Sequence, residues 1–131
     1  MRSAPTTFAT RLVTCAVLAL PSCGGVASPE VRAEAPEPAT ELEGRGRALF
    51  TGPAACSACH GGAGGGTMLG PALQGLAARW SAETLAEYLA DPAGYAARHP
   101  EIEHRRMPQP AVTDAADLAA LAAWTLRLMG A

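Results

Sequence analysis

Cys56-Ser57-Ala58-Cys59-His60 is the stretch of sequence that decides the fold of this chain. Two cysteines separated by two residues and followed directly by a histidine form the pattern for covalent haem attachment. Each thiol can add across one vinyl group of the haem, and the short turn between them brings both sulfurs to one edge of the porphyrin. His60 can then reach the iron as its proximal ligand. The segment therefore predicts one covalently bound haem c, held by Cys56, Cys59 and His60.

Three other interpretations of the two cysteines are weaker. A zinc site needs four nitrogen or sulfur ligands, and the other histidines, His99 and His104, lie far beyond the usual spacing. A redox pair of the thioredoxin type needs a βαβ context, and no strand-like run flanks the cysteines. A structural disulfide would leave the adjacent His60 without a role.

The composition indicates one small domain with few large side chains. The chain has 131 residues, of which 49% are apolar but only 5% aromatic, and alanine dominates the apolar fraction. A small alanine-rich domain buries little area per residue, so its stability is marginal without a staple or a prosthetic group. A haem would supply the large apolar centre that this composition lacks.

Residues 1–22 have the pattern of an export signal. Arg2 and Arg11 form a basic region, and residues 12–20 form an apolar run that is too short to span a bilayer. Leu20-Pro21-Ser22-Cys23-Gly24 then resembles a bacterial lipobox, in which Cys23 is the lipidated residue. The alternative is ordinary signal cleavage a few residues later. Both routes place the chain in the periplasm, and lipidation would anchor it to a membrane.

Residues 23–40 are rich in proline, alanine and glutamate and have no apolar periodicity, which predicts a disordered tether. The folded domain is then expected over residues 41–131. Cleavage before Cys23 removes two of the ten basic residues and none of the twelve acidic ones, which leaves a net charge of −4. With no lysine and this net charge, the chain is not expected to bind nucleic acid.

Three helices are expected in the folded domain, which predicts an all-α fold. The first spans Glu41–Thr51, where Gly46 indicates the close approach of another backbone and Phe50 faces the same neighbour. The second spans Ser81–Ala90, starts with a serine cap and is stopped by Pro92.

The third helix spans Thr113–Leu128, with Thr113 or Asp114 as its N-cap and Gly130 closing it. Its apolar face is formed by Leu118, Leu121, Trp124 and Leu128. Small alanines around this face allow another helix to pack very near, and Gly46 of the first helix is the natural partner.

Residues 93–110 are expected to be an irregular, charged segment. A methionine on a loop between two helices is the expected sixth ligand of the iron, and Met107 meets this description. Met68 is too near the proximal histidine in sequence to cross to the other haem face, and Met129 ends a helix. His104 is the alternative sixth ligand, because a bis-histidine haem would need only a small shift along this loop.

A second motif follows a glycine-rich run and reads Gly70-Pro71-Ala72-Leu73. The Pro71 carbonyl can accept a hydrogen bond from the Nδ1–H of His60, which would fix the imidazole ring and make the ligand more basic. The alternative is a simple turn.

Taken together, these motifs resemble those of a class I c-type cytochrome domain over about residues 41–131. The matching residues follow the family's order: Gly46 and Phe50, Cys56-x-x-Cys59-His60, Gly70-Pro71-x-Leu73, Trp80 with Tyr88, Leu89 and Pro92, Met107-Pro108, and Leu121-x-x-Trp124. The resemblance implies a small cytochrome c fold of three to five helices wrapped around one haem. It implies that Pro71 bonds His60, that Leu73 packs on the haem, and that Trp80 donates to a propionate. Tyr88 would lie near the Met107 sulfur.

The sequence departs from this family pattern in two places. The stretch from Pro92 to Met107 is longer than in the compact members, which puts the conformation of the ligand loop in question. The lysine-rich docking face of some members is absent, so their partners do not carry over to this chain.

With both axial positions filled by the protein, the iron has no open site for a substrate. We therefore expect a periplasmic one-electron carrier that serves redox partner proteins and is not itself an enzyme. One alternative is a haem subunit of an oxidoreductase complex. The other is a ligand-binding or peroxidatic haem in which the bond to Met107 is labile.

Overall fold

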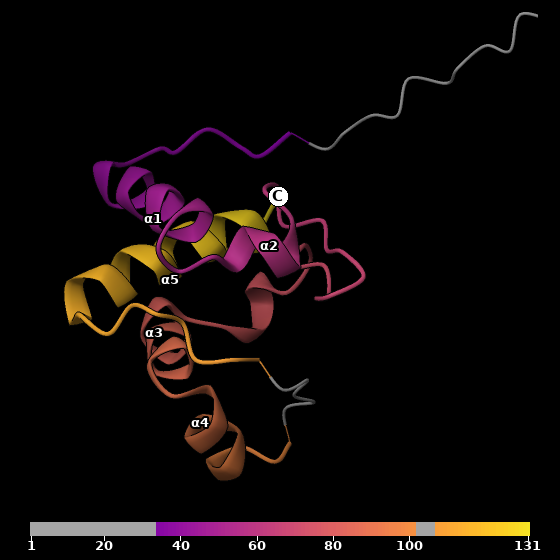
Figure 1. Cartoon of the computed structure of the whole chain (residues 1–131), viewed down its shortest axis with the longest axis vertical. Coiled ribbons are helices and arrows are strands. Elements are labelled where there is room, and N and C mark those ends of the chain that lie inside the picture. The colour runs from indigo at the N-terminus through magenta and orange to yellow at the C-terminus, as the bar shows by residue number, and fades with distance from the viewer. Residues whose placement is uncertain (1–33, 102–106) are drawn as a thin grey trace, which may run out of the picture. The chain divides into compact units, whose positions relative to one another are not determined.

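The structure, a computed structural model, describes residues 34–101 and 107–131 (Figure 1). Within these ranges all regular structure is helical, which confirms the predicted all-α class. The elements are α1 (Glu41–Thr51), α2 (Cys56–His60), the 3₁₀ turn η1 (Ala77–Arg79), α3 (Ala82–Ala90), α4 (Pro92–Arg98) and α5 (Ala115–Met129). No helix of the described ranges is both long enough and apolar enough to cross a bilayer.

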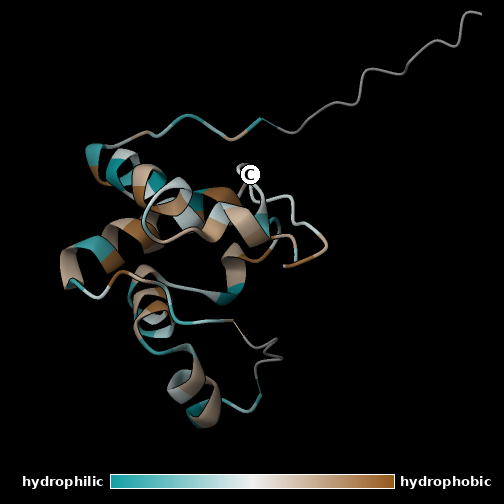
Figure 2. Ribbon diagram, viewed as in Figure 1, coloured by the Kyte–Doolittle hydropathy of each residue, from teal (hydrophilic) through white to brown (hydrophobic). Residues whose placement is uncertain are grey.

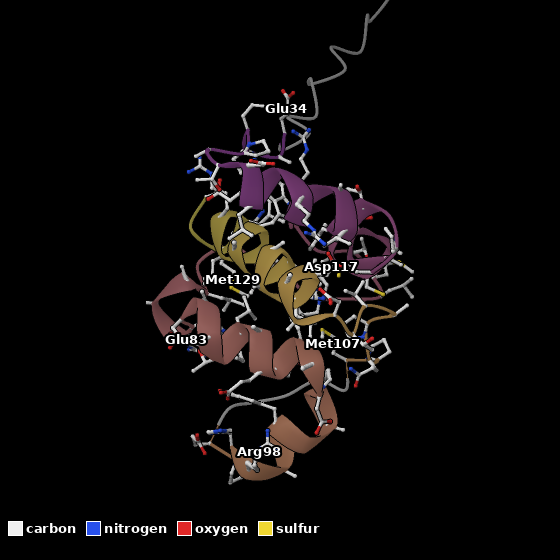
Figure 3. All side chains as sticks on the ribbon, turned by 90° about the vertical axis from the view of Figure 1, so that its left-hand side faces the viewer. Glu34, Glu83, Arg98, Met107, Asp117 and Met129 are labelled. Carbon is white, nitrogen blue, oxygen red and sulfur yellow. The ribbon has the colours of Figure 1, made fainter. Side chains whose placement is uncertain are left out.

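Helix α5 lies between α1 and α3 and contributes most of the core (Figure 3). Its hydrophobic stretch is covered by α1 on one side and α3 on the other (Figure 2). The most deeply buried large side chains come from these three helices and are Phe50, Leu85, Leu121, Trp124 and Leu128. The core is therefore built around the apolar face that the sequence predicts for the last helix.

Helix α1 approaches α5 without any side chain between the two backbones at Gly46. A Cβ placed on Gly46 would overlap the carbonyl oxygen of Ala120 and lie 2.7 Å from the Cβ of Trp124. Only glycine fits this position, and the predicted close approach is confirmed. An ion pair between Arg45 and Asp117, with 2.5 Å between nitrogen and oxygen, joins the same helices at the surface. Such an exposed pair contributes little, so packing holds the two helices together.

The predicted helix ends are confirmed to within two residues. Helix α1 has the predicted bounds, and the Thr40 hydroxyl accepts a hydrogen bond from the backbone N–H of Glu43 at 3.1 Å. Ser81 caps α3 through a capping box with Thr84. Asp114, rather than Thr113, caps α5, because its carboxylate accepts two backbone N–H bonds from the first turn.

The expectation that residues 93–110 are irregular is wrong in its first part. Pro92 is the first residue of α4, and the carboxylate of Asp91 caps that helix by accepting from the N–H of Gly94 at 2.9 Å. Proline disrupts the interior of a helix because it lacks a backbone N–H. At the first position this does no harm, because the N–H of the first helical residue has no partner within the helix. The same residue therefore ends α3 and begins α4.

The predicted signal segment, residues 1–22, and the predicted lipidation site Cys23 lie outside the described residues, and these predictions stay untested. Residues 34–40 contain no helix or strand. Arg127 donates to the backbone carbonyl of Glu37 at 3.2 Å, and Arg47 bonds the carboxylate of the same residue at 3.2 Å. These contacts hold the end of the expected tether against α1 and α5.

Replacing Gly46 by alanine tests the contact between α1 and α5. The variant Gly46→Ala should lose about 1–3 kcal/mol of unfolding free energy, because the new methyl group must push the two backbones apart. The matched control is Gly44→Ala in the same helix, where an added Cβ would meet nothing within 4 Å. That variant should be unchanged or gain up to about 1 kcal/mol from helix propensity. Urea unfolding of both variants measures the difference, and equal stabilities would contradict the proposed packing.

Candidate functional site

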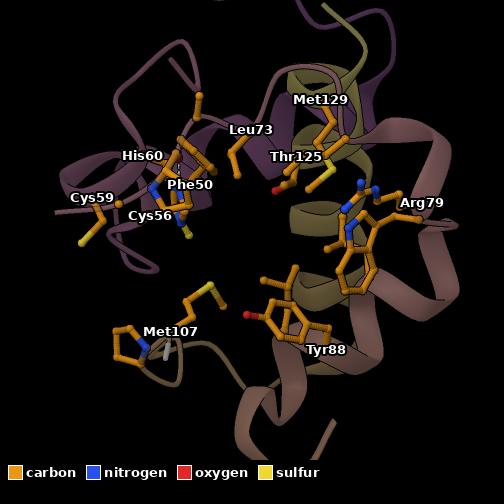
Figure 4. Close-up of a pocket in the computed structure, with 18 of the residues that line it drawn as sticks. Phe50, Cys56, Cys59, His60, Leu73, Arg79, Tyr88, Met107, Thr125 and Met129 are labelled. Atoms are coloured by element: carbon orange, nitrogen blue, oxygen red, sulfur yellow. Dashed lines mark hydrogen bonds between the residues drawn. The ribbon is translucent and has the colours of Figure 1, made fainter. Parts of the chain in front are cut away.

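A cavity of about 440 Å³ lies between α2, α3, α5 and the segment that follows residue 106 (Figure 4). Its walls are mostly apolar and include Phe50 from α1, Leu85 and Leu89 from α3, and Thr125 and Met129 from α5. All the residues that the sequence singles out for the haem and that the structure describes line this cavity. They are Cys56, Cys59, His60, Pro71, Leu73, Trp80, Tyr88 and Met107.

The first wall is the one-turn helix α2, which carries the two cysteines and the histidine. It starts after Ala55, whose backbone has φ of +53°, a left-handed conformation that costs a non-glycine residue energy. The Cys56 sulfur lies 3.7 Å from the carbonyl oxygen of Ala54. Burial raises the pKa of the Cys56 thiol to about 11, and the nearby Cys59 thiol contributes in the same direction. Before haem attachment, the Cys56 side chain is therefore a neutral thiol at physiological pH.

The imidazole of His60 is oriented by the loop that follows α2. Its Nδ1 lies 2.8 Å from the carbonyl oxygen of Pro71, as predicted. A carbonyl can only accept, so this bond requires the proton on Nδ1 and leaves the Nε2 lone pair available to a metal. The described residues thus hold His60 in the tautomer that an iron ligand needs.

The same loop is fixed to the backbone of α2 at a second point. The Thr67 hydroxyl donates to the carbonyl oxygen of Cys59 at 2.6 Å, and Gly70 packs against that same peptide group. A Cβ on Gly70 would lie 2.8 Å from the Cys59 oxygen, so a larger residue does not fit. Leu73 follows and is buried at the cavity wall.

Met107 reaches the cavity from a different segment, opposite His60 and Cys56 (Figure 4). The Tyr88 hydroxyl points toward the Met107 side chain in the same view, and burial raises the pKa of Tyr88. The side chain of Gln109 donates to the carbonyl of Ala90 at the end of α3, which ties the segment after Met107 to that helix. His104, the alternative ligand, lies outside the described residues.

Two residues at the site are not indicated by any motif in the sequence. Arg79 lines the cavity beside Trp80, and its only sequence signal is its position next to the tryptophan expected to bind a propionate. Tyr95 of α4 is buried behind the wall, with its ring centroid 5.7 Å from that of Trp80 and 5.6 Å from that of Tyr88. An irregular segment gives no reason to bury a tyrosine, so only the presence of α4 explains its position.

The residues around the cavity fit a haem in their chemistry. Two thiols and an imidazole with a free Nε2 lie at one wall, and a thioether lies at the opposite wall. Apolar side chains suit the porphyrin faces, while Arg79 and Trp80 offer N–H donors for its carboxylates. The structure gives no support to a zinc site at the cysteines, because the described ranges contain no group of three or more His, Cys, Asp or Glu side chains able to hold a metal.

Comparison with known families agrees with this chemistry. A family model described as cytochrome c matches residues 44–128 of the chain. No curated protein and no solved structure matches the chain. The matched range begins in α1 and ends in α5, so it contains every residue that lines the cavity except Met129.

Preventing haem attachment tests whether the cavity can exist by itself. Without a haem, the apolar walls of this cavity stay exposed to water, so the domain lacks the apolar burial that a bound porphyrin would provide. The variant Cys56→Ala/Cys59→Ala, purified without haem, should therefore lose cooperative urea unfolding and most amide protection from hydrogen exchange. A haem-free variant that unfolds as cooperatively as the haem-bound protein would show instead that the side chains alone make a sufficient core.

Proposed function

The chain belongs to the cytochrome c family, and from this premise we propose that it is a one-electron carrier with His60 and Met107 as the axial ligands of its haem. The family binds haem c covalently through the Cys-x-x-Cys-His motif, which is Cys56 to His60 here. When bound, the haem iron supplies a one-electron Fe(III)/Fe(II) couple. The observation that carries the proposal is that an oriented imidazole and a thioether enter one cavity from opposite walls.

His60 is proposed to be the permanent ligand. It is adjacent to the attachment cysteines, and the hydrogen bond to Pro71 fixes both its ring orientation and its tautomer. Partial negative charge from the Pro71 carbonyl makes the imidazole a better donor. Because the hydrogen bond from Nδ1 to the Pro71 carbonyl holds the ring, we expect it to move little between the two oxidation states, which favours outer-sphere electron transfer.

Met107 is proposed to fill the other axial position and to set a fairly high reduction potential. A neutral thioether favours the ferrous state relative to a stronger donor. The apolar walls act in the same direction, because they disfavour the additional positive charge of the ferric state. With the two axial positions occupied, neither a substrate nor a small ligand has an open place to bind.

Arg79 and Trp80 are proposed to hold the propionates. A guanidinium can pair with one carboxylate through two parallel N–H bonds, and the indole N–H can donate to a carboxylate oxygen. The two residues are consecutive in the chain, and both line the cavity. Compensating the propionate charge in this way would add to the preference for a haem over a smaller apolar ligand.

The proposed location is the periplasm, with Cys23 as a lipid anchor to a membrane. The support is the export pattern of residues 1–22 and the lipobox-like sequence that follows it. Covalent haem attachment in bacteria is also an extracytoplasmic process in the family that the chain resembles. The redox partners are proposed to be proteins reached from that anchor. The same electron transfer would suit a haem subunit of a larger oxidoreductase, in which the donor is the catalytic subunit.

The competing function is a ligand-binding or peroxidatic haem with a labile bond to Met107. The hydrogen bond from Gln109 to the Ala90 carbonyl counts against this function, because the bond restricts the segment that carries the Met107 thioether. The carrier is therefore the better-supported function.

Optical spectra of three proteins test the axial ligands. The reduced wild-type protein should show a sharp c-type α-band, and the oxidised protein should show the near-infrared charge-transfer band of a Met–Fe bond. Met107→Ala should lose that band, fall in reduction potential and bind CO avidly when reduced. His104→Ala should keep the band and bind no CO.

The reverse pattern, in which His104→Ala opens the site and Met107→Ala does not, would replace Met107 by His104 as the ligand. Avid CO binding by the reduced wild-type protein at neutral pH would instead favour the ligand-binding function.

A further inference from the structure

Helix α5 places one buried threonine among its apolar side chains. Thr125 lines the cavity and is only 5% exposed. Among the described residues, it is the one buried side chain that is neither apolar nor aromatic. An apolar side chain of the same size would be buried there at a lower cost, because a hydroxyl loses its hydrogen bonds to water. The presence of a hydroxyl at this position therefore needs a physical reason.

The hydroxyl proton of Thr125 is bonded to the backbone of its own helix. Its Oγ1 donates to the carbonyl oxygen of Leu121, one turn earlier in α5, at 2.7 Å. A hydroxyl has one proton and two acceptor lone pairs, so this bond leaves only lone pairs for other partners. No donor among the described residues bonds to them. In Figure 4 the oxygen points from the α5 wall into the cavity. Thr125 therefore presents the negative end of its dipole to the group that fills the cavity.

The fold of α5 does not require this hydroxyl. Within the helix, the carbonyl of Leu121 also accepts from the backbone N–H of Thr125. Loss of the hydroxyl would thus leave no buried polar group without a partner, and such an unpaired group is the main cost of breaking a buried hydrogen bond. Threonine also favours a helix less than the alanines and leucines that make up most of α5. The effect of the hydroxyl is therefore expected on the cofactor.

A fixed dipole at the cavity wall acts on the charge of the haem iron. Fe(III) carries one more positive charge than Fe(II), so a partial negative charge nearby stabilises Fe(III) more. The surrounding apolar side chains screen this interaction weakly. Met107 and the apolar walls have the opposite effect, since both favour Fe(II). The oxygen of Thr125 therefore opposes the other features that set the reduction potential.

We propose that Thr125 tunes the haem, and that its oxygen lowers the reduction potential by offsetting part of the rise produced by Met107 and the apolar walls. This inference rests on the proposed electron-carrier function. In the step concerned, one electron from a donor protein converts Fe(III) to Fe(II). No bond forms or breaks at Thr125 and no proton moves, because the hydroxyl keeps its hydrogen bond to Leu121 in both states.

A redox titration of the haem-bound protein, followed by its visible spectrum, tests this role. Thr125→Val keeps the branched shape of the side chain and removes the oxygen. It should shift the equilibrium constant for reduction about three- to tenfold toward Fe(II), which is a rise of about 30–60 mV at 59 mV per tenfold for one electron. Thr125→Ser keeps the hydroxyl and should change the constant by less than about twofold. Thr125→Ala also removes the oxygen and should shift the potential in the same direction as Thr125→Val, so the test does not depend on one variant.

The matched control is Thr51→Val at the end of α1. The Thr51 hydroxyl makes the same kind of bond, to the carbonyl of Arg47 at 3.0 Å, but Thr51 is exposed and does not line the cavity. Its substitution should leave the equilibrium constant within about 1.5-fold of the wild type. The near-infrared Met–Fe band of each oxidised variant is recorded as well. An unchanged band shows that the axial ligands are the same, so that a change in potential reports the lost dipole.

The sign of the shift decides between the possible roles of the hydroxyl. A fall in potential in Thr125→Val would overturn the proposal, because it would mean that the hydroxyl directs its proton toward the haem. An unchanged potential would also overturn it, as would a rise of the same size in Thr125→Ser. In these three cases the carrier function stands. If the wild-type protein shows no reversible one-electron couple, both the function and this inference fail.

Discussion

The side chains of this domain leave an apolar cavity at its centre, and the rest of the structure depends on the group that fills this cavity. Alanine dominates its apolar residues, and α2, α3 and α5 line a cavity of about 440 Å³ that no side chain fills. Without a haem, the apolar walls of this space stay exposed to water, which costs the free energy that their burial would contribute to folding. A covalently attached haem removes that cost, because its two faces supply the packing surface that alanines cannot. The attachment cysteines therefore matter for the packing of the domain as well as for its redox site.

Around this centre, the packing of α1 on α5 provides the rigid frame. Gly46 lets the two backbones meet, and Phe50, one turn further along α1, contributes both to the core and to the cavity wall. The frame positions α2, and the loop after it orients His60 through Pro71. Met107 comes from the other side, on a segment tied to the end of α3 by Gln109. The two proposed ligands are therefore anchored independently of each other, by separate segments of the protein.

The sequence is sufficient for the features that rest on local chemistry. Caps, glycine positions and apolar spacing predict α1, α3 and α5, and the motif at Cys56 to His60 predicts the position of the cavity. It is insufficient where one residue serves two elements or where contacts are long-range. Pro92 is correctly expected to end one helix, but it is equally favourable at the first position of the next, so the sequence pattern does not reveal α4. The burial of Tyr95 is missed for the same reason, because this residue belongs to α4. No local sequence pattern indicates Arg79, because its position at the cavity depends on where η1 lies in space.

The most direct test of the central claim is the proton NMR spectrum of the reduced, haem-bound protein with its methionine methyl groups labelled. If the haem lies between His60 and Met107, the Met107 methyl resonance will be shifted far upfield by the porphyrin ring current, while that of the exposed Met68 will keep an ordinary position. A spectrum in which the Met107 methyl resonates where a methionine in water does, in a folded protein whose Cys56 and Cys59 thiols are both titratable, would contradict the claim that a haem fills this core.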